Sequence, residues 1–573
     1  MKRLLTYLKR HPLATLFAPL FKMLEASFEL FVPLVVAKMI DIGIYQKNAG
    51  YLWRMGALLV LLGIIGFGFA ITAQYFAAKS AVSTGRDLRN DLFAHINTLS
   101  FKEIDTLGTS TLINRMTNDV NQVQNGINMF LRLFLRSPFV VFGAMVMAFT
   151  VDAKAAIPFV IVIPALAVVV FAILLITMPL YKNVQKQLDD VLLSTRENLL
   201  GIRVVRAFNR QESEMESFGK KSSQLFFRQI HVGKISALLN PVTYVIINLG
   251  IIAILWSGGN QVYLGRLTQG QVIALINYMN SILQALIVFA NVLSIYNKAT
   301  ASYQRVFEVL ETTPQVENQG SYSTLIPDEK MIEFKDVNFG YLQKDVLHNL
   351  SFTINKGETV GIIGGTGAGK STLVSLIGRN YDVRSGQIKI AGKNIQDYKL
   401  ETLRQHISYV LQNTSLISGT IKENICMSKP YQEETMNKAL EVSQAKEFVS
   451  CLPQGIESAV VQGGKNFSGG QRQRLTIARA LYKQADILVL DDCSSALDYA
   501  TDAALQKQLQ ELKEMTKIVI SQRTASLKRC DRIMVLYHGE LVGFDCHEEL
   551  LKNCTVYKEI YESQNSKDGD YNG

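Results

Sequence analysis

The N-terminal half of the chain consists of long apolar runs separated by polar segments. Six of these runs approach or exceed the ~20 residues that a membrane-spanning helix needs, and they lie at roughly 14–44, 55–78, 127–150, 155–180, 236–260 and 270–298. From Met331 onward, short β-rich runs alternate with amphipathic helices, which is typical of a soluble α/β domain. The pattern therefore predicts a membrane domain of six helices followed by an α/β domain.

A polar stretch with Pro314, Gly320 and Pro327 separates the two parts. The boundaries that follow are 1–311 for the transmembrane domain, 312–330 for a linker, 331–562 for the α/β domain and 563–573 for a tail. We expect the tail to be disordered because it is polar and contains glycine.

Composition and charge support a membrane protein. Hydrophobic residues make up 48% of the chain and the mean hydropathy is +0.14. Basic residues gather at the N-terminus and within 79–131 and 181–234, so we expect these segments to be cytoplasmic. The net charge of +10 is therefore assigned to membrane-flanking segments, and no nucleic-acid partner is expected. Charged residues interrupt the first apolar run and no small-x-small cleavage site follows, so we expect a retained helix rather than a signal peptide.

One glycine-rich segment has the spacing of a phosphate-binding loop. A predicted strand at 359–363 leads into the pattern G-x-x-x-x-G-K-S, and a helix follows. Glycines let successive backbone N–H groups converge on phosphate oxygens, the lysine reaches the β and γ oxygens, and the serine hydroxyl ligates magnesium. The predicted ATP-binding residues are Gly364, Gly365, Thr366, Gly367, Ala368, Gly369, Lys370, Ser371 and Thr372.

Two further segments carry groups that ATP chemistry uses. The apolar strand at 487–490 ends in Asp491, an acidic residue suited to hold magnesium through its water shell. Between this strand and the phosphate loop lies the segment NFSGGQRQR at 466–474. Its serine and two glycines open a predicted helix, which gives a second helix terminus suited to anions.

These three motifs together resemble the nucleotide-binding domain of ABC transporters. The signature residues would be Ser468, Gly469, Gly470 and Gln471. Six helices before one such domain are similar to a half-size ABC exporter of the type IV fold, whose α/β domain has a P-loop (RecA-like) core and a helical subdomain. The segments 101–120 and 195–212 resemble the two intracellular loops of the family. Importers usually keep the ATPase on a separate chain, so the resemblance favours export.

The resemblance implies roles for further residues. Tyr341 would stack on adenine, although a solvent-exposed tyrosine at a strand end is the alternative. Gln412 would sense the γ-phosphate and join Ser371 and Asp491 around magnesium. The D-loop would consist of Ser495, Ala496, Leu497 and Asp498. Two domains of the family sandwich two ATP molecules head to tail, so one chain alone would not complete a site.

Three positions depart from the family pattern. The family places a glutamate after the strand aspartate, and this chain has Asp492, which is one methylene shorter. The family's switch histidine is replaced by Gln522, which cannot carry a positive charge. A neutral segment at 461–464 replaces an acidic and basic run before the signature. Because a misplaced general base typically costs ~10²–10⁴-fold in rate, we expect a site that binds ATP and hydrolyses it slowly.

The intact signature beside an impaired site suggests how the chain assembles. A homodimer would contain two impaired sites, which suits a pump badly. A partner half-transporter that carries the catalytic glutamate and histidine would form one competent site against Ser468. This arrangement resembles the heterodimeric bacterial multidrug exporters, which implies a multi-pass protein of the plasma membrane with a cytoplasmic N-terminus and nucleotide-binding domain.

Charged and polar groups within the expected membrane helices are the substrate candidates. Lys22, Glu25 and Glu29 share one face of the first helix, and Glu29 is the better candidate because Lys22 can pair with Glu25. Asn280 and Gln284 belong to a polar track in the last helix. An amphipathic cation is the expected substrate, and an interhelical hydrogen-bond network is the alternative.

Two further functions compete with heterodimeric multidrug export. A nucleotide-gated regulator or channel also fits weakened catalytic positions, although no segment resembles a regulatory insert. A lipid or peptide exporter working as a homodimer is the other alternative, and we expect no N-terminal protease domain, which argues against a processing peptide exporter. Substrate-stimulated ATP turnover separates the exporters from the regulator.

Overall fold

The structure is a computed structural model that describes residues 2–318, 320–325, 328–341, 344–427, 429–493 and 496–565. Two compact units make up the chain, the first formed by Met1–Asn97 and Thr109–Glu311 and the second by Thr98–Gly108 and Thr312–Gly573. The short segment Thr98–Gly108 therefore packs with the second unit, although it interrupts the sequence of the first.

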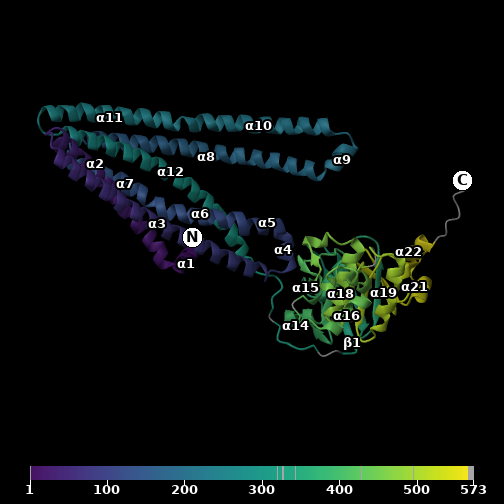
Figure 1. Cartoon of the computed structure of the whole chain (residues 1–573). Helices are drawn as coiled ribbons and strands as arrows, with labels where there is room; N and C mark the ends of the chain where they lie inside the picture. Colours follow the sequence, from purple (N-terminus) through teal and green to yellow (C-terminus); the bar gives the residue numbers. More distant parts are fainter. Residues whose placement is uncertain are drawn as a thin grey trace. The chain divides into compact units, whose positions relative to one another are not determined.

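The described residues of the first unit form helices joined by short turns (Figure 1). Its α-helices are α1 (Lys2–Lys9), α2 (Pro12–Lys38), α3 (Ala49–Ile96), α5 (Thr109–Asn114), α6 (Val120–Met129), α7 (Arg136–Val151), α8 (Ile157–Leu200), α9 (Ile202–Ala207), α10 (Gln211–Ala237), α11 (Leu239–Tyr263) and α12 (Gln269–Glu311). Three π-helical turns continue or join them, namely η1 (Met39–Ile44), η2 (Arg115–Asp119) and η3 (Phe130–Phe134). Such turns are rare within helices and often mark functional positions.

Five helical stretches in the described part of the chain are long and apolar enough to cross a membrane: Ala49–Ile96, Thr109–Val151, Ile157–Leu200, Gln211–Tyr263 and Gln269–Glu311. The expected count of six is therefore not confirmed by length and composition. The missing one corresponds to α2, whose Lys22, Glu25 and Glu29 bring three charged residues into its central turns. α2 nevertheless packs within the bundle, where the hydroxyl of Tyr278 on α12 donates to the carbonyl oxygen of Leu30 at 2.7 Å.

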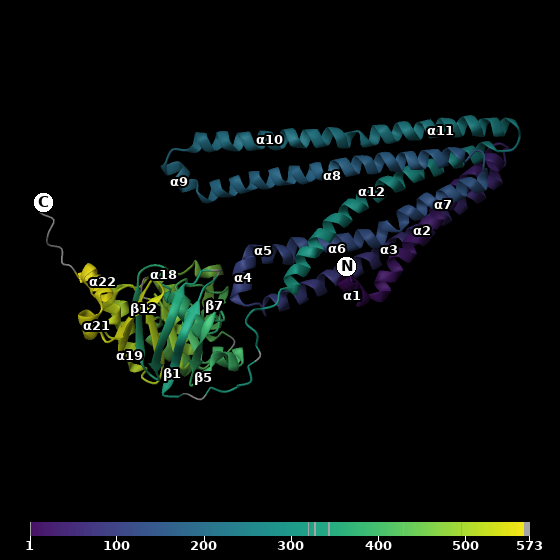
Figure 2. The same ribbon diagram turned by 180° about the vertical axis from the view of Figure 1, so that it is seen from behind.

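The long polar segments between the expected spans are mainly helical rather than looped. α8 runs on to Leu200, and α10 returns beside it as far as Ala237, with the short α9 at the turn (Figures 1 and 2). A charged segment with few glycines and prolines continues a helix readily, because solvated lysine, arginine, glutamate and glutamine are good helix formers. The helix ends therefore differ from those of the apolar runs.

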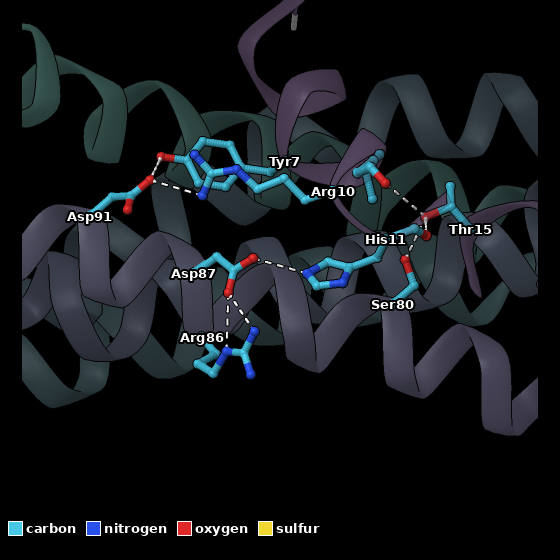
Figure 3. A network of polar contacts seen from close by, with 9 residues as sticks. Tyr7, Arg10, His11, Thr15, Ser80, Arg86, Asp87 and Asp91 are labelled. Carbon is cyan, nitrogen blue, oxygen red and sulfur yellow. Dashed lines mark hydrogen bonds and ion pairs between the residues drawn. The ribbon is translucent and has the colours of Figure 1, made fainter. Parts of the chain in front are cut away.

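The first helix is fastened to α3 by side-chain contacts (Figure 3). The Tyr7 hydroxyl donates to Asp91 at 2.7 Å, and the Arg10 guanidinium donates to the same carboxylate at 3.3 Å. His11 lies 2.9 Å from the carboxylate of Asp87 on the same face of α3. These contacts hold α1 and the turn after it against the C-terminal part of α3.

The second unit is built on two larger sheets. A six-stranded sheet has the order β12-β11-β3-β10-β9-β6, with β3 (Thr359–Gly364), β6 (Ile407–Val410), β9 (Ile487–Asp491), β10 (Thr516–Ile520), β11 (Arg532–Tyr537) and β12 (Glu540–Asp545). A four-stranded antiparallel sheet has the order β2-β1-β4-β5, with β1 (Lys330–Phe339), β2 (Leu347–Asn355), β4 (Ser385–Ile390) and β5 (Lys393–Asn394). A small third sheet pairs β7 (Gly419–Thr420) with β8 (Ala459–Val460).

Helices flank these sheets (Figure 2). They are α4 (Phe101–Leu107), α13 (Lys370–Ile377), α14 (Leu400–Gln405), α15 (Ile421–Cys426), α16 (Glu433–Val442), α17 (Lys446–Ser450), α18 (Gly469–Tyr482), α19 (Tyr499–Glu511), α20 (Thr524–Leu527), α21 (His547–Asn553) and α22 (Thr555–Asn565). β9 is buried on both faces, with Leu488 and Leu490 in one hydrophobic core and Ile487 and Val489 in the other. This explains why its sequence is apolar throughout rather than alternating.

Candidate nucleotide-binding site

The candidate site lies along one edge of the six-stranded sheet. β10 runs parallel to both β3 and β9, and Ile520 is level with Ile362 on one side and Asp491 on the other. Parallel strands end on the same edge, where α/β domains bind ligands. The segments that follow β3, β9 and β10 are therefore neighbours, and they carry the phosphate loop, Asp492 and Gln522 respectively.

The phosphate loop has the backbone that its glycines allow. Gly367 and Gly369 have φ angles of 79° and 94°, a left-handed region that favours glycine, and α13 begins at the next residue, Lys370. The Lys370 ammonium donates to the carbonyl oxygens of Gly364 and Gly365, each at 2.8 Å. Burial lowers the pKa of Lys370, opposed by the charges of Asp491 and Asp492. The lysine thus lies over the loop that would receive the phosphates.

Asp491 is placed to serve a magnesium ion. It is only 7% exposed, and its carboxylate is hydrogen-bonded to the Ser371 side chain. Burial raises the pKa of Asp491, and the bond to Ser371 opposes that shift. A hydroxyl and a carboxylate in contact are the hard oxygen ligands that magnesium prefers, so the residues fit this ion. Gln412 follows β6, the strand that pairs with β9, and its side chain is exposed at the same edge.

Tyr341 lies against the phosphate-loop helix. It follows β1, and its hydroxyl is 3.0 Å from the Thr372 hydroxyl on α13. Its ring makes edge contacts with Phe339 and Tyr381, with centroids 5.2 Å and 5.3 Å apart. The side chain is 41% exposed, so one part of the ring is open to a base. The contact with Thr372 connects this tyrosine to the phosphate-loop helix, and stacking on adenine stays a prediction.

Two of the three departures from the family pattern, Asp492 and Gln522, lie just beyond the ends of neighbouring strands. Asp492 has a φ of 50°, and its N–H donates to the Ile520 carbonyl at 3.0 Å. Its own carbonyl accepts from Gln473 of α18 at 3.4 Å, and Gln473 is 2% exposed. The backbone at Asp492 is therefore fixed from β10 and from the signature helix. The side chain of Gln522, two residues beyond β10, is exposed.

The segment with Gln522 is also held by the C-terminal helix. Gln564 of α22 donates to the Gln522 carbonyl at 2.7 Å and accepts from the backbone and hydroxyl of Thr524 at 2.9 and 3.0 Å. Gln564 falls within the tail at 563–573 that we expected to be disordered, but α22 runs to Asn565, and 566–573 lie outside the described residues. The buried Tyr557 within α22 is the sequence signal that this helix packs.

The signature residues form an exposed helix start. Ser468 caps α18, and its hydroxyl accepts from the Gln471 N–H at 3.3 Å while the Gln471 side chain accepts from the Ser468 N–H at 2.9 Å. A Cβ at Gly470 would approach the Ala496 carbonyl to 3.0 Å, so the D-loop packs on the signature. The adjacent Leu497 is buried.

The D-loop ends where α19 begins. Asp498 caps α19 and accepts from the Thr501 N–H and hydroxyl at 2.9 and 2.8 Å. Bonds from Thr501 lower the pKa of Asp498. Ser495, the first D-loop residue expected from the sequence, lies outside the described residues.

The neutral segment before the signature forms a tight turn. Gly463 and Gly464 have φ angles of 72° and 65°, and the Gly463 N–H donates to the Leu416 carbonyl at 3.2 Å. A Cβ at Gly464 would meet Leu416 at 2.9 Å and Arg472 at 3.0 Å. This turn connects the segment after Gln412 with the signature helix.

The short helix α4 also contacts the nucleotide-binding domain. The Tyr381 hydroxyl donates to Asp105 of α4 at 2.6 Å, and Phe101 packs on the same ring at 6.2 Å. Burial and the nearby Asp105 carboxylate raise the pKa of Tyr381. Because Tyr381 also touches Tyr341, α4 is two side chains away from the expected adenine contact. Nothing in the sequence pattern singles out Asp105 or Tyr381, since their pairing spans 276 positions.

Among the substrate candidates of the membrane domain, Glu29 differs from the expectation. Lys22 pairs with Glu25 as expected, with the ammonium 2.7 and 2.6 Å from the two carboxylate oxygens. Glu29 was expected to be unpaired, but Arg136 at the start of α7 donates to it at 2.5 Å. The partner comes from a different helix, so spacing along α2 could not reveal it. Asn280 and Gln284 are exposed on α12.

Comparisons with known proteins agree with this architecture. The family model for the ABC transporter transmembrane region matches residues 15–286, and the model for the ABC transporter matches residues 347–495. The ABC transporter ATP-binding protein YfiB of Bacillus subtilis (strain 168) is 36% identical over 573 residues, 99% of each chain. An ATP-dependent lipid A-core flippase of Desulfotalea psychrophila is 32% identical over 536 residues, 92% of this chain and 93% of that protein.

The fold is shared with a solved exporter. The structure of a bacterial Atm1-family ABC exporter with ATP bound matches with a TM-score of 0.82 at 22% identity, covering 97% of this chain and 99% of that chain. At this identity the likeness concerns the fold. The chain belongs to the ABC transporter family, and it is an ATP-driven, half-size exporter that carries a multi-pass membrane region and an ATP-binding domain in one polypeptide.

Proposed function

We propose that this chain is the ATP-retaining subunit of a heterodimeric bacterial exporter of amphipathic molecules in the plasma membrane. The observation that carries the proposal is the pair of Asp492 and Gln522 at one sheet edge, beside a phosphate loop that keeps every residue of its motif. Binding groups are complete and the two hydrolytic positions are weakened. Inconsistencies confined to one functional position point to altered function rather than to loss of the fold.

The chemistry at this site follows from its residues. Backbone N–H groups of the loop and Lys370 would bind the phosphates, and Ser371, Asp491 and Gln412 would hold magnesium. When bound, magnesium neutralises charge on the β and γ oxygens. The short side chain of Asp492 would keep its carboxylate too far from the γ-phosphate to position the attacking water well. The neutral Gln522 would not compensate the negative charge that develops on the γ-phosphate in the transition state. The site therefore holds ATP for long periods.

The signature of this chain would complete the competent site. Ser468 is exposed at the start of α18, and the N-terminus of a helix favours binding of a phosphate, here the partner's. A partner with glutamate and histidine at the two weakened positions would hydrolyse ATP there. Closure of the two domains on ATP would be passed through 103–118 and 200–215 to the membrane helices, and hydrolysis would reset the transporter.

The test is magnesium-dependent ATP turnover of this chain purified alone and together with its candidate partner, with nucleotide binding measured in parallel. We expect binding without appreciable turnover by the chain alone and substrate-stimulated turnover by the pair. Brisk turnover by the chain alone would refute the impaired site and favour a homodimer. Nucleotide-dependent conformational change without transport by the pair would favour the regulator.

A homodimeric lipid exporter is the second proposal. The flippases of lipid A-core from several bacteria are 30–32% identical to this chain over at least 92% of its length. In this alternative the Asp492 and Gln522 sites would both turn over slowly but sufficiently. Scrambling of labelled lipid by the chain reconstituted alone, in an ATP-dependent manner, would favour it.

A further inference from the structure

Charged side chains gather where α2 meets η3 and the start of α7. Lys22, Glu25 and Glu29 lie on α2, and Arg132 and Arg136 lie on η3 and α7. The elements are in contact, since η3 and α7 both pack on α2 and Arg136 bonds to Glu29. The five residues lie within the apolar runs at 14–44 and 127–150. The group therefore contains three cations and two carboxylates, and it carries an excess positive charge.

Each arginine has one buried N–H donor without a partner among the described residues. Arg136 gives one N–H to Glu29, at 2.5 Å, and the Nε atoms of Arg132 and Arg136 are buried without a hydrogen-bond partner among the described residues. A guanidinium has five N–H donors in a planar fork that matches phosphate or carboxylate. Glu25 does not satisfy them, because Lys22 binds both of its carboxylate oxygens. Arg132 thus has no ion-pair partner among the described residues of the helical domain.

An uncompensated arginine in a membrane helix requires a counter-charge. Ionisable side chains within membrane helices are costly, and they usually face a cavity and mark substrate pathways. The Arg136 side chain is 18% exposed and that of Glu29 is 48% exposed, so this cluster opens to the surface of the bundle. The charge balance also reverses the expectation from the sequence, since the pairing of Glu29 leaves no free carboxylate to attract a cation.

We propose that Arg132 and Arg136 form a headgroup site in the transport pathway and that the transported amphiphile is anionic, with a phosphate group on an apolar body. This rests on the proposed export of amphipathic molecules and names their class. Arg132 binds the phosphate directly, and Arg136 joins it while remaining bonded to Glu29. Glu29 acts as a positioning residue that orients Arg136 and limits its affinity for anions.

The test measures binding rather than transport, so its result does not depend on the partner or on ATP turnover. The full chain in detergent is titrated with phosphatidylglycerol, with phosphatidylcholine of the same acyl chains, and with a cationic amphiphile such as tetraphenylphosphonium, and bound ligand is counted by native mass spectrometry. We expect phosphatidylglycerol to bind at least about tenfold tighter than phosphatidylcholine. R132Q should lower that affinity about tenfold, the loss of one charge-assisted contact.

Variants separate headgroup recognition from folding. E29Q should raise affinity for phosphatidylglycerol severalfold, because it removes a competing carboxylate. The neutral pair E29Q/R136Q creates no new unpaired charge, and it should still bind phosphatidylglycerol more weakly than E29Q. K22Q/E25Q removes the neighbouring pair on α2 and serves as the matched control, with phosphatidylglycerol affinity within about twofold of the wild type.

Three results would overturn the proposal. The first is equal affinity for phosphatidylglycerol and phosphatidylcholine in the wild type. The second is preferential binding of the cationic amphiphile that E29Q abolishes, which would restore the carboxylate as the substrate contact. The third is binding of inorganic phosphate as tightly as phosphatidylglycerol, which would assign the arginines to a free anion instead of an amphiphile. Weak competition by inorganic phosphate at millimolar concentration supports the headgroup assignment.

Discussion

Replacing Asp492 with glutamate should accelerate ATP hydrolysis by this chain. The change advances the carboxylate by one C–C bond, about 1.5 Å, toward the water that attacks the γ-phosphate. A well-placed general base is worth about 10²–10⁴ in rate, which is about 3–5 kcal/mol of barrier. In D492E the neutral Gln522 still leaves the charge that develops in the transition state uncompensated. The hydrolysis rate of this single variant should therefore rise by about 10²-fold, the lower end of that range.

The backbone at this position sets the competing cost. Asp492 has a φ of 50°, which aspartate tolerates better than glutamate does, and a longer side chain there costs about 1–2 kcal/mol of folding free energy. Bonds from Ile520 and Gln473 hold the backbone on both sides, so the conformation should persist. The strain lowers the free energy of unfolding and does not raise the activation barrier of hydrolysis. D492E should therefore have a slightly lower melting temperature and a faster ATP turnover than the wild type.

The assay is phosphate release by the purified chain at saturating Mg-ATP, with each variant compared with its own K370A background to remove contaminating activity. D492N serves as the matched control, because it keeps the shorter length and removes the base. Adding Q522H to D492E should increase the rate further. Unchanged rates in D492E, or a rapid wild type that D492N does not slow, would refute the reasoning that side-chain length at 492 limits hydrolysis.

The remaining predictions concern other parts of the site. In the heterodimer, S468A should reduce turnover at least tenfold while D492N changes it less than twofold, and equal losses would contradict the asymmetric model. Burial raises the pKa of Asp491, so its ionised form costs folding free energy above that pKa. D491N should therefore raise the melting temperature of the nucleotide-free chain at pH 7, and this increase should disappear below about pH 4, where Asp491 is protonated in the folded and unfolded chains. D491N should also abolish stabilisation by Mg-ATP. Y381F should leave ATP affinity within about threefold but lower substrate stimulation of turnover, measured as the ratio of stimulated to basal rate. Q564A should destabilise the segment around Gln522 by about 1 kcal/mol, measured as faster amide hydrogen exchange in that segment. Unchanged exchange would show that the hydrogen bonds of Gln564 do not hold the segment in place.

The fold was predictable where local pattern determines structure. The phosphate loop, β9 with Asp491, and the start of α18 at Ser468 each follow from a motif of fewer than ten consecutive residues, and the structure brings the first two to one sheet edge through the register of β10. Helix ends were not predictable from hydropathy, because a charged helix continues in water where an apolar run stops. α8 illustrates this, since it extends about twenty residues beyond its apolar run.

Contacts between distant residues were the part that the sequence could not supply. Arg136 with Glu29, Tyr381 with Asp105 and Gln564 with Thr524 are separated by 107, 276 and 40 positions, and each pairs side chains that are ordinary in their own segment. Spacing along α2 correctly indicated Lys22 with Glu25, because residues three apart share a helix face. The charged residues of the membrane domain therefore had to be grouped by their positions in three dimensions before the charge of the substrate could be inferred.

A site that binds ATP and hydrolyses it slowly can act on the transporter mainly through binding energy. That energy must leave the site through the backbone and through side chains that touch the nucleotide, rather than through Asp492. The connection from Thr372 through Tyr341 and Tyr381 to Asp105 of α4 would provide such a path, with polar contacts of 3.0 and 2.6 Å at its two ends. Losing the Tyr381 hydroxyl should consequently impair coupling more than losing the Asp492 carboxylate does. The reverse order would mean that hydrolysis at this site, rather than occupancy, drives the conformational change.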